Sequence, residues 1–445
     1  MSVLGLVVFV ALLLTVLGLM NYYIWRRVVR STTRPGSRGR RIGTWLIVVA
    51  FLATGIAQVA SRLVSPEVAR PLAWVGFGWL GVAFYFFLFL LLGELVRLAL
   101  RIFGVGRRKP VIDAAASAEA AAAMRQESTV AAVAVAAAAA PASGGPGAVR
   151  TTPADPTSGS SLAENEREVN RRLFLARSIA LGAGVAAAGV GGYGITRALA
   201  DPVVRRVPVQ IAGLDPRLAG FRIALFSDAH LGSIRRRAAM EKLVDTVNGA
   251  EPDMVAVLGD LIDGSVAELG GDVAPMAGLQ SPHGTYFVTG NHEYYSGAPE
   301  WIGYLPDLGV RVLRNERLAI ERDGAAFDLA GVNDINGEDF DDPPDFDQAL
   351  GGRRADRPVV LLVHQPVNVD LAVDYGVDLQ LSGHTHGGQL WPFHYIIAAQ
   401  QGALSGLSRI KETQLYVTSG AGFWGPPMRV GADPEIVVIE LQPET

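Results

Sequence analysis

The sequence contains no cysteine and very little lysine. The absence of cysteine excludes disulfides, thiolate metal sites, iron–sulfur clusters and thiol nucleophiles, so any metal site must use His, Asp, Asn or Glu. Lys109, Lys242 and Lys411 are the only lysines, and the formal net charge is only −4. Overall charge therefore does not indicate a nucleic-acid partner.

Charge is also missing from several long stretches, and 50% of all residues are hydrophobic. The runs at 3–25, 42–61 and 71–93 can each cross about 30 Å of hydrocarbon as a helix. Residues 1–109 are therefore predicted to form a three-helix transmembrane region. Arginine-rich stretches follow the first and third runs, so both should be cytoplasmic and the N-terminus should lie outside.

Residues 110–170 are rich in Ala, Pro, Ser and Gly and have few large apolar side chains. Such a composition predicts a disordered cytoplasmic linker. Residues 171–200 contain a fourth apolar run that follows several arginines, and they favour either a fourth transmembrane helix or an export signal. The run from Asn170 to Leu175 resembles a twin-arginine signal, and Ala198-Leu199-Ala200 resembles a peptidase site. Either alternative leaves the remaining chain outside.

Five short strand-like segments in the last part of the chain each run into a cluster of polar residues. The segments are 221–226, 254–258, 285–288, 359–363 and 379–381, and the clusters are SDAH at 227–230, GDLID at 259–263, GNHE at 290–293, HQP at 364–366 and GHTHGG at 383–388. Loops at the carboxyl edge of a sheet are where open α/β folds place ligands. The five clusters are therefore expected to converge.

Local spacing and glycines support this convergence. Asp228 and His230 are two residues apart, as are His384 and His386, so in an extended strand end each pair would point to one side. Glycines in the clusters allow sharp turns and close approach of the backbone.

The clusters together supply oxygen and nitrogen ligands without sulfur, which suit Mn, Fe, Zn or Mg. Seven ligands exceed the needs of one ion. Asp260 can bridge two ions about 3.5 to 4 Å apart. The predicted ligands are Asp228, His230 and His386 at one ion, and Asn291, His364 and His384 at the other.

Two such ions could hold a bridging hydroxide and stabilise the charge that develops during in-line displacement at phosphorus. His292 lies next to a predicted ligand, and we predict that it acts as the general acid toward the leaving group. Asp263 and Glu293 are expected to orient ligands. His283 and His394 are expected to have surface or packing roles.

The ordered set D-x-H, G-D-x-x-D, G-N-H-E, H-Q-P and G-H-T-H resembles the calcineurin-like metallophosphoesterase superfamily. The segment 382–389 and the run SGAGFWGPP at 419–427 are similar to its bacterial membrane-associated branch. The resemblance implies an α/β fold at 205–443, with a β-sandwich flanked by helices (α/β/β/α), preceded by the all-α transmembrane region.

Two segments allow more than one interpretation. Arg235, Arg236 and Arg237 could attract phosphate near the site, but a solvated helix face is favoured. The segment 423–427 is either a substrate-facing loop or a rigid surface turn.

The sequence thus predicts a multi-pass protein of the bacterial cytoplasmic membrane whose catalytic domain is extracytoplasmic. We expect a metal-dependent phosphoesterase that hydrolyses a phosphoester or pyrophosphate bond, with a lipid-linked or cell-envelope substrate and no nucleic acid. By resemblance only, related bacterial proteins include pyrophosphatases of nucleotide-linked lipids. One alternative is a non-catalytic metal-binding scaffold or membrane sensor on the same fold. A nuclease or cyclic-nucleotide phosphodiesterase fits the expected location less well.

Overall fold

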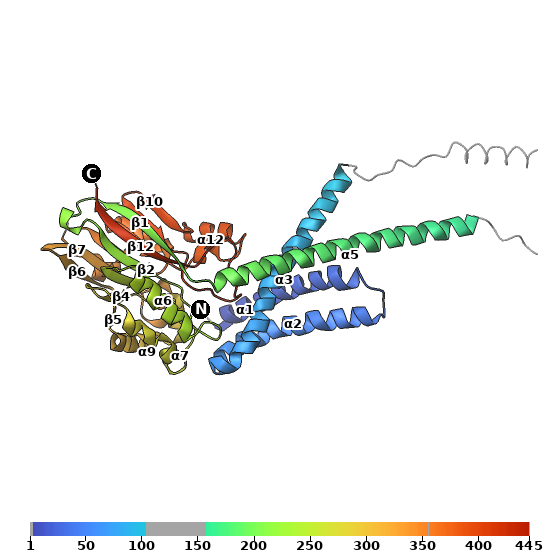
Figure 1. Ribbon diagram of the computed structural model, residues 1–445, viewed down its shortest axis with the longest axis horizontal. Helices are drawn as coiled ribbons and strands as arrows, with labels where there is room; N and C mark the ends of the chain where they lie inside the picture. The colour runs from blue at the N-terminus through green and yellow to red at the C-terminus, as the bar shows by residue number, and fades with distance from the viewer. Residues whose placement is uncertain (1–2, 104–156, 355, 445) are drawn as a thin grey trace, which may run out of the picture. The chain divides into compact units, whose positions relative to one another are not determined.

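The computed structural model describes residues 3–103, 157–354 and 356–444. These residues fall into two compact units. The first combines the residues up to Phe89 with those from Ala180 onward, and the second consists of the described residues within Leu90–Ile179. Residues 104–156, which include the predicted linker as far as 156, lie outside the described residues. The chain contains long apolar helices and a mixed α/β region, which Figure 1 labels.

The long helices are α1 (Val3–Ile24), α2 (Arg38–Leu63), α3 (Pro66–Ile102) and α5 (Thr157–Ala198). Apolar stretches within α2, α3 and α5 are long enough to cross a membrane, as predicted for these runs. For α1, the crossing stays a prediction. Helix α5 begins inside the segment that was predicted to be a disordered linker, so that prediction is wrong for residues 157–170. Leu, Ala, Glu and Arg in this stretch are good helix formers and extend the apolar helix toward its N-terminus.

The α/β region contains two six-stranded sheets. The first has the order β1-β12-β2-β3-β4-β5 and the second the order β10-β11-β9-β8-β7-β6. The first sheet comprises β1 (Val203–Ile211), β2 (Phe221–Phe226), β3 (Met254–Val257), β4 (Thr285–Phe287), β5 (Val310–Val312) and β12 (Glu435–Pro443). The second comprises β6 (Glu316–Arg322), β7 (Ala325–Gly331), β8 (Val359–Leu362), β9 (Leu379–Ser382), β10 (Gly406–Ile410) and β11 (Thr413–Val417).

The sheets form the inner layers of a four-layer structure, and the alternation of side chains along the strands explains why. Along β2, Ile223 and Leu225 enter a core shared with the second sheet. Ala224 and Phe226 point to the opposite face, where they meet residues of α6 (Arg237–Gly249) and α7 (Val266–Val273). This alternation is the period of a strand with two buried faces.

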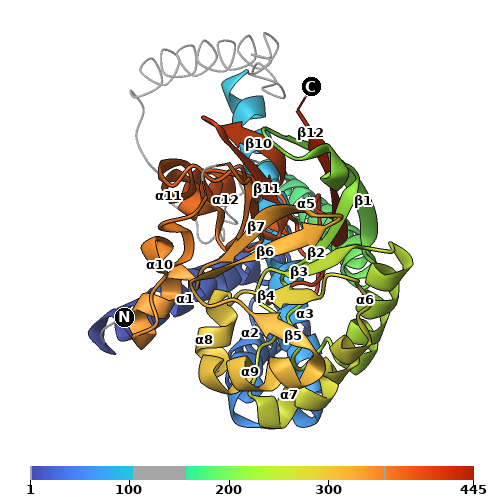
Figure 2. The same cartoon turned by 90° about the vertical axis from the view of Figure 1, so that its left-hand side faces the viewer.

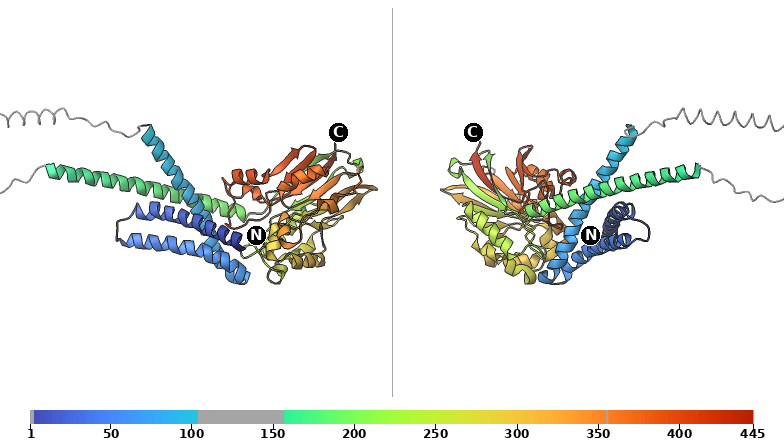
Figure 3. Two further views of the ribbon diagram at one scale, coloured as in Figure 1. Left: turned by 180° about the vertical axis from the view of Figure 1, so that it is seen from behind. Right: turned by 45° about the vertical axis from the view of Figure 1, so that its right-hand side comes forward.

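Helices cover the outer face of each sheet. Figure 2 shows α6 and α7 beside the first sheet and α10 (Phe346–Leu350) and α11 (Val369–Asp374) beside the second. Figure 3 shows the same strands and helices in two further views. The predicted α/β/β/α sandwich is confirmed, and all five predicted strands exist with bounds that differ by no more than one residue.

The direction in which the strands pair determines where the polar clusters lie. Strands β2, β3 and β4 are parallel neighbours, and so are β8 and β9. Parallel neighbours bring their carboxyl ends to the same edge. All five polar clusters follow these strands, so each sheet delivers its clusters along one edge.

Candidate metal centre

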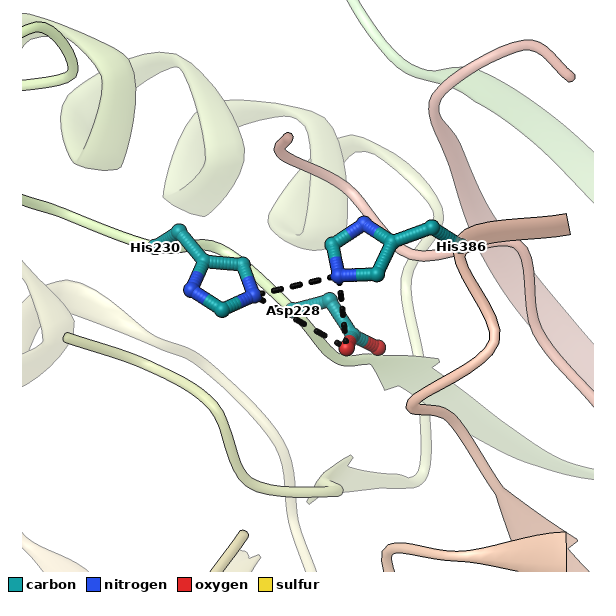
Figure 4. A group of neighbouring side chains, drawn as sticks. All are labelled: Asp228, His230 and His386. Atoms are coloured by element: carbon teal, nitrogen blue, oxygen red, sulfur yellow. Dashed lines mark hydrogen bonds and ion pairs between the residues drawn. The ribbon is translucent and has the colours of Figure 1, made fainter. Parts of the chain in front are cut away.

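Three predicted ligand side chains meet after β2 and β9, and Figure 4 shows them. His386 Nε2 lies 3.3 Å from Asp228 Oδ1 and 3.1 Å from His230 Nε2. His230 Nε2 lies 4.0 Å from the same carboxylate oxygen. Three ligand atoms that face one point at these separations could hold one cation.

A second set of ligand atoms surrounds His364. Its Nε2 lies 3.2 Å from Asp260 Oδ2, from Asn291 Oδ1 and from His384 Nδ1. Asp260 Oδ2 is also 3.7 Å from His230 Nε2, which belongs to the first set. The Asp260 carboxylate thus lies between the two groups, where a bridging ligand would have to be. The structure brings all seven predicted ligands together.

Hydrogen bonds hold the two carboxylates so that one oxygen of each remains available. Asp228 Oδ2 accepts the backbone N–H of His384, whereas Asp228 Oδ1 is buried without a hydrogen-bond partner. Asp260 Oδ1 accepts the backbone N–H of His292. A buried carboxylate oxygen without a partner is costly unless a cation compensates it, so the residues present fit a metal site.

Local contacts also favour metal binding by three of the histidines, through the ring orientation of His364 and the neutral state of His384 and His386. The backbone carbonyl of Leu258 accepts a 2.6 Å hydrogen bond from His364 Nδ1, which leaves Nε2 as the ligand atom. Burial and the positive charge of His364 lower the pKa of His384 to about 3. Burial, together with His230 and Arg429, holds the pKa of His386 well below its usual range. Both rings are therefore neutral near pH 7.

The carboxylates show opposite pKa shifts. Burial raises the pKa of Asp228, and repulsion from Asp260 adds to the rise. Burial alone would raise the pKa of Asp260 as well, but His364 and His292 outweigh it and hold that pKa well below its usual range. Two neighbouring buried acids of this kind need positive charge between them.

Asp263 and Glu293 form hydrogen bonds with residues of the site, in line with the expectation that they orient ligands. Asp263 Oδ1 lies 3.2 Å from His230 Nδ1 and 2.5 Å from His292 Nδ1. Glu293 accepts the backbone N–H groups of Gly290, Asp260 and Leu261 at 2.7 to 2.9 Å. Glu293 thereby fastens the β3 loop to the β4 loop.

The local backbone differs from the extended strand ends that the sequence predicted. Asp228, His230, Asp260, His384 and His386 all have positive φ, between 45° and 68°. Left-handed backbone is costly for residues other than glycine, and such strain gathers at functional sites. The side chains converge because the loops turn sharply, and the two-residue spacing of an extended strand is not the cause.

The three consecutive arginines are not a solvated helix face as a group. Arg235 is buried, and its Nε donates to the Ala229 carbonyl 2.9 Å away. Arg236 forms ion pairs with Glu67 and Asp272. Arg235 contributes structural support instead, because it braces the loop that carries Asp228 and His230.

The sequence did not single out Arg429, which is completely buried beside the site. Its guanidinium donates to the backbone carbonyls of Gly422 and Ser419 at 2.6 and 2.8 Å, and its Nη2 lies 3.4 Å from His386 Nδ1. An arginine in an otherwise apolar Pro-Pro-Met-Arg-Val run was the available signal, since a buried arginine needs several acceptors.

Comparisons with known proteins match the same part of the chain. A family described as calcineurin-like phosphoesterase matches residues 221–388, which include all seven predicted ligands. An uncharacterized metallophosphoesterase of Helicobacter pylori is 37% identical over 280 residues, which make up 62% of this chain and 73% of that protein. The Bacillus subtilis metallophosphoesterase YkuE is 34% identical over 288 residues, or 62% of this chain and 99% of that protein.

Relatives with a membrane region are also found. A Bos taurus transmembrane protein with metallophosphoesterase domain is 38% identical over 262 residues, which make up 56% of this chain and 59% of that protein. Among solved structures, the calcineurin-like phosphoesterase YfkN of Bacillus subtilis is 14% identical and has a TM-score of 0.32, covering 50% of this chain and 91% of that chain. In this chain, α2, α3 and α5 are the described helices that are long and apolar enough to cross a membrane.

Proposed function

This chain belongs to the calcineurin-like phosphoesterase family, and on that premise we propose that it hydrolyses a phosphoester or pyrophosphate bond with two divalent cations. Asp228, His230 and His386 would hold one cation, Asn291, His364 and His384 the other, and Asp260 both. The observation that carries this proposal is the unpartnered Asp228 Oδ1 in a group of buried ligand atoms. Mn, Fe, Zn and Mg all suit these ligands.

Two cations in this position would supply a hydroxide nucleophile and the positive charge that phosphoryl transfer requires. Side chains of the protein would carry out the remaining steps. His292 would donate its proton to the leaving oxygen, while Asp263 holds the imidazole through Nδ1 and leaves Nε2 to face the substrate. Burial alone would lower the pKa of His292, but Asp260 and Asp263 outweigh it and raise that pKa to about 9, so the acid is protonated at neutral pH.

Hydrolysis by the full-length protein in detergent tests this proposal. Chelation should abolish hydrolysis of 4-nitrophenyl phosphate or of its methyl diester, Mn should restore it, and Asp260→Ala should remove it permanently. His292→Ala should slow esters of alkyl alcohols far more than 4-nitrophenyl esters, because only poor leaving groups need a proton. Two bound cations without hydrolysis of any ester or pyrophosphate would instead support the alternative, a metal-binding scaffold or membrane sensor.

We further propose that the protein lies in a bacterial cytoplasmic membrane with the catalytic domain outside, and that its substrate is lipid-linked or belongs to the cell envelope. The arginine-rich residues 26–41 and the apolar helices α2, α3 and α5 support this orientation. The domain limits 1–109, 110–170, 171–200 and 205–443 remain part of the proposal, except that 157–170 is helical.

The cysteine-free sequence permits a direct test of orientation. In intact cells an impermeant maleimide should label Glu412→Cys in the catalytic domain but not Ser31→Cys between α1 and α2. The reverse pattern contradicts the proposed orientation. Replacement of Arg171 and Arg172 by Lys should block export if the twin-arginine signal operates, and should leave labelling unchanged if α5 is an ordinary anchor.

A further inference from the structure

Two large aromatic side chains contact the ring of His292 and remain half-exposed. Tyr295 is 58% exposed and Trp424 is 51% exposed. Each ring centroid lies 5.5 Å from that of His292, with interplanar angles of 68° and 72°. Because the rings meet His292 at steep angles, the imidazole covers only part of each aromatic surface.

Hydrogen bonds hold Tyr295 in place from the second sheet. The Tyr295 hydroxyl accepts from Asn336 Nδ2 at 2.9 Å. Asn336 Oδ1 in turn accepts from Gln365 Nε2 at 3.0 Å, and Gln365 directly follows the predicted ligand His364. Side-chain hydrogen bonds therefore connect the tyrosine to Gln365, the chain neighbour of a predicted ligand.

Trp424 is held through its backbone by one glutamine. Its N–H donates to Gln389 Oε1 at 3.0 Å, and its carbonyl accepts from Gln389 Nε2 at 3.0 Å. Gln389 itself has a φ of 40°, a left-handed conformation that is costly for this residue type. The segment 423–427 is thus fixed beside the site.

Exposed aromatic rings on segments that are held in place offer preformed surfaces on which a flat ligand group can pack. A ring that packs on Tyr or Trp gains free energy from buried area and from aromatic geometry, and little side-chain entropy remains to be lost. His292 is the proposed proton donor, so the leaving group must lie within reach of it and hence against these two rings.

We propose that Tyr295 and Trp424 form the leaving-group subsite, which selects esters whose released alcohol has a flat apolar face. An aryl ring has such a face, and so does the CH face of a sugar. This inference rests on the proposed hydrolysis and specifies its substrate class. It also assigns the segment at 423–427 a substrate-facing role.

The test compares leaving groups on one phosphoryl group. The substrates are phenyl phosphate, glucose 1-phosphate and n-butyl phosphate, together with the methyl diester of each. All are assayed with the Mn-loaded full-length protein. Trp424→Ala and Tyr295→Ala should each raise KM for the phenyl or glucosyl esters by about 5- to 10-fold. The KM of butyl esters and the inhibition constant of inorganic phosphate should change less than about 2-fold, because neither needs a ring contact. Trp424→Phe should retain most of the preference.

Matched controls are Trp391→Ala and Tyr395→Ala, whose side chains are 52% and 71% exposed and, among the described residues, are not in contact with His292. Both controls should behave as wild type. Equal losses on phenyl, glucosyl and butyl esters, or weaker phosphate inhibition, would indicate a purely structural role and overturn the inference. A preference for the phenyl ester would indicate an aryl ring as the flat face, and a preference for the glucosyl ester would indicate a sugar.

A separate measurement keeps this test independent of hydrolysis. If no ester is cleaved, the proposed function fails, but binding of phenylphosphonate and butylphosphonate to the Mn-loaded protein can still be compared by calorimetry. Tighter binding of phenylphosphonate that Trp424→Ala abolishes supports the subsite. Equal affinity for the two phosphonates overturns it.

Discussion

Asp263 Oδ1 lies 2.5 Å from His292 Nδ1 and, at the same time, 3.2 Å from His230 Nδ1. One carboxylate oxygen therefore orients both a predicted metal ligand and the predicted general acid. Burial alone would raise the pKa of Asp263, but the two histidines outweigh it and hold that pKa well below its usual range. The carboxylate stays ionised and fixes the distance between acid and metal centre.

The first prediction concerns the alkaline limb of the pH–rate profile. His292 must be protonated to act as an acid, so activity should fall as pH rises through its pKa, which the neighbouring carboxylates raise. Asp263→Asn removes one of the carboxylates that raise this pKa, and the limb should move to lower pH by roughly one unit or more. The measurement is kcat/KM against pH for an alkyl ester. An unchanged limb would contradict the assignment of His292.

The second prediction concerns metal removal. Without cations, Asp228 and Asp260 are buried and repel each other, so chelation should lower the melting temperature of the full-length protein. A ligand at 100 times its Kd stabilises a fold by about 2.7 kcal/mol, which corresponds to roughly 5 to 10 °C for a domain of this size. Differential scanning fluorimetry with and without Mn measures the shift. In Asp228→Asn the shift should shrink, and an equal shift there would argue against binding at this carboxylate.

The third prediction concerns Gly290. A Cβ atom at this position would lie 2.3 Å from Asp260 Oδ1 and 2.5 Å from the backbone nitrogen of Asp260. Gly290→Ala should therefore displace the bridging carboxylate and reduce both bound metal, measured by elemental analysis, and hydrolysis. Gly303→Ala is the control, because a Cβ there meets nothing within 4 Å inside α9 (Ala298–Tyr304). Normal metal content in Gly290→Ala would disprove the bridging position of Asp260.

The fourth prediction concerns Arg429. Arg429→Lys keeps the charge but cannot satisfy the separated carbonyls of Gly422 and Ser419. Loss of these buried hydrogen bonds should destabilise the domain by roughly 3 kcal/mol and loosen the loop that carries His386. Denaturant unfolding and metal content are the two measurements. Arg409→Lys, at an exposed arginine paired with Glu412, should change stability by less than about 0.5 kcal/mol, and a similar effect from both variants would contradict the prediction.

Much of the candidate site could be predicted because its residues stand in short, locally readable segments. Short strand-like runs such as 221–226 consist of consecutive residues, so each of the five strands could be recognised locally. The polar residue types that follow, from Asp228 to His386, restrict the chemistry to oxygen and nitrogen ligands. The apolar runs that form α2, α3 and α5 were readable for the same reason, since length and lack of charge suffice to recognise them.

Other features could not be read locally. The left-handed backbone at Asp228 and His384 follows from how the loops pack against each other, and sequence spacing suggested an extended backbone instead. The burial of Arg235 and Arg429 depends on carbonyl groups that the folded loops present to them. The helical conformation of 157–170 extends an apolar helix into a stretch whose composition favoured disorder.

The amino-acid sequence by itself determined the strands, the apolar helices and the ligand types, because each depends on neighbours along the chain. Only the tertiary structure decided that Arg429 lies beside His386, and that Tyr295 and Trp424 both reach His292. These residues come from loops far apart in the chain, and the pairing order of strands in two sheets brings the loops together. Relations of this kind depend on distances in space, which no local pattern encodes.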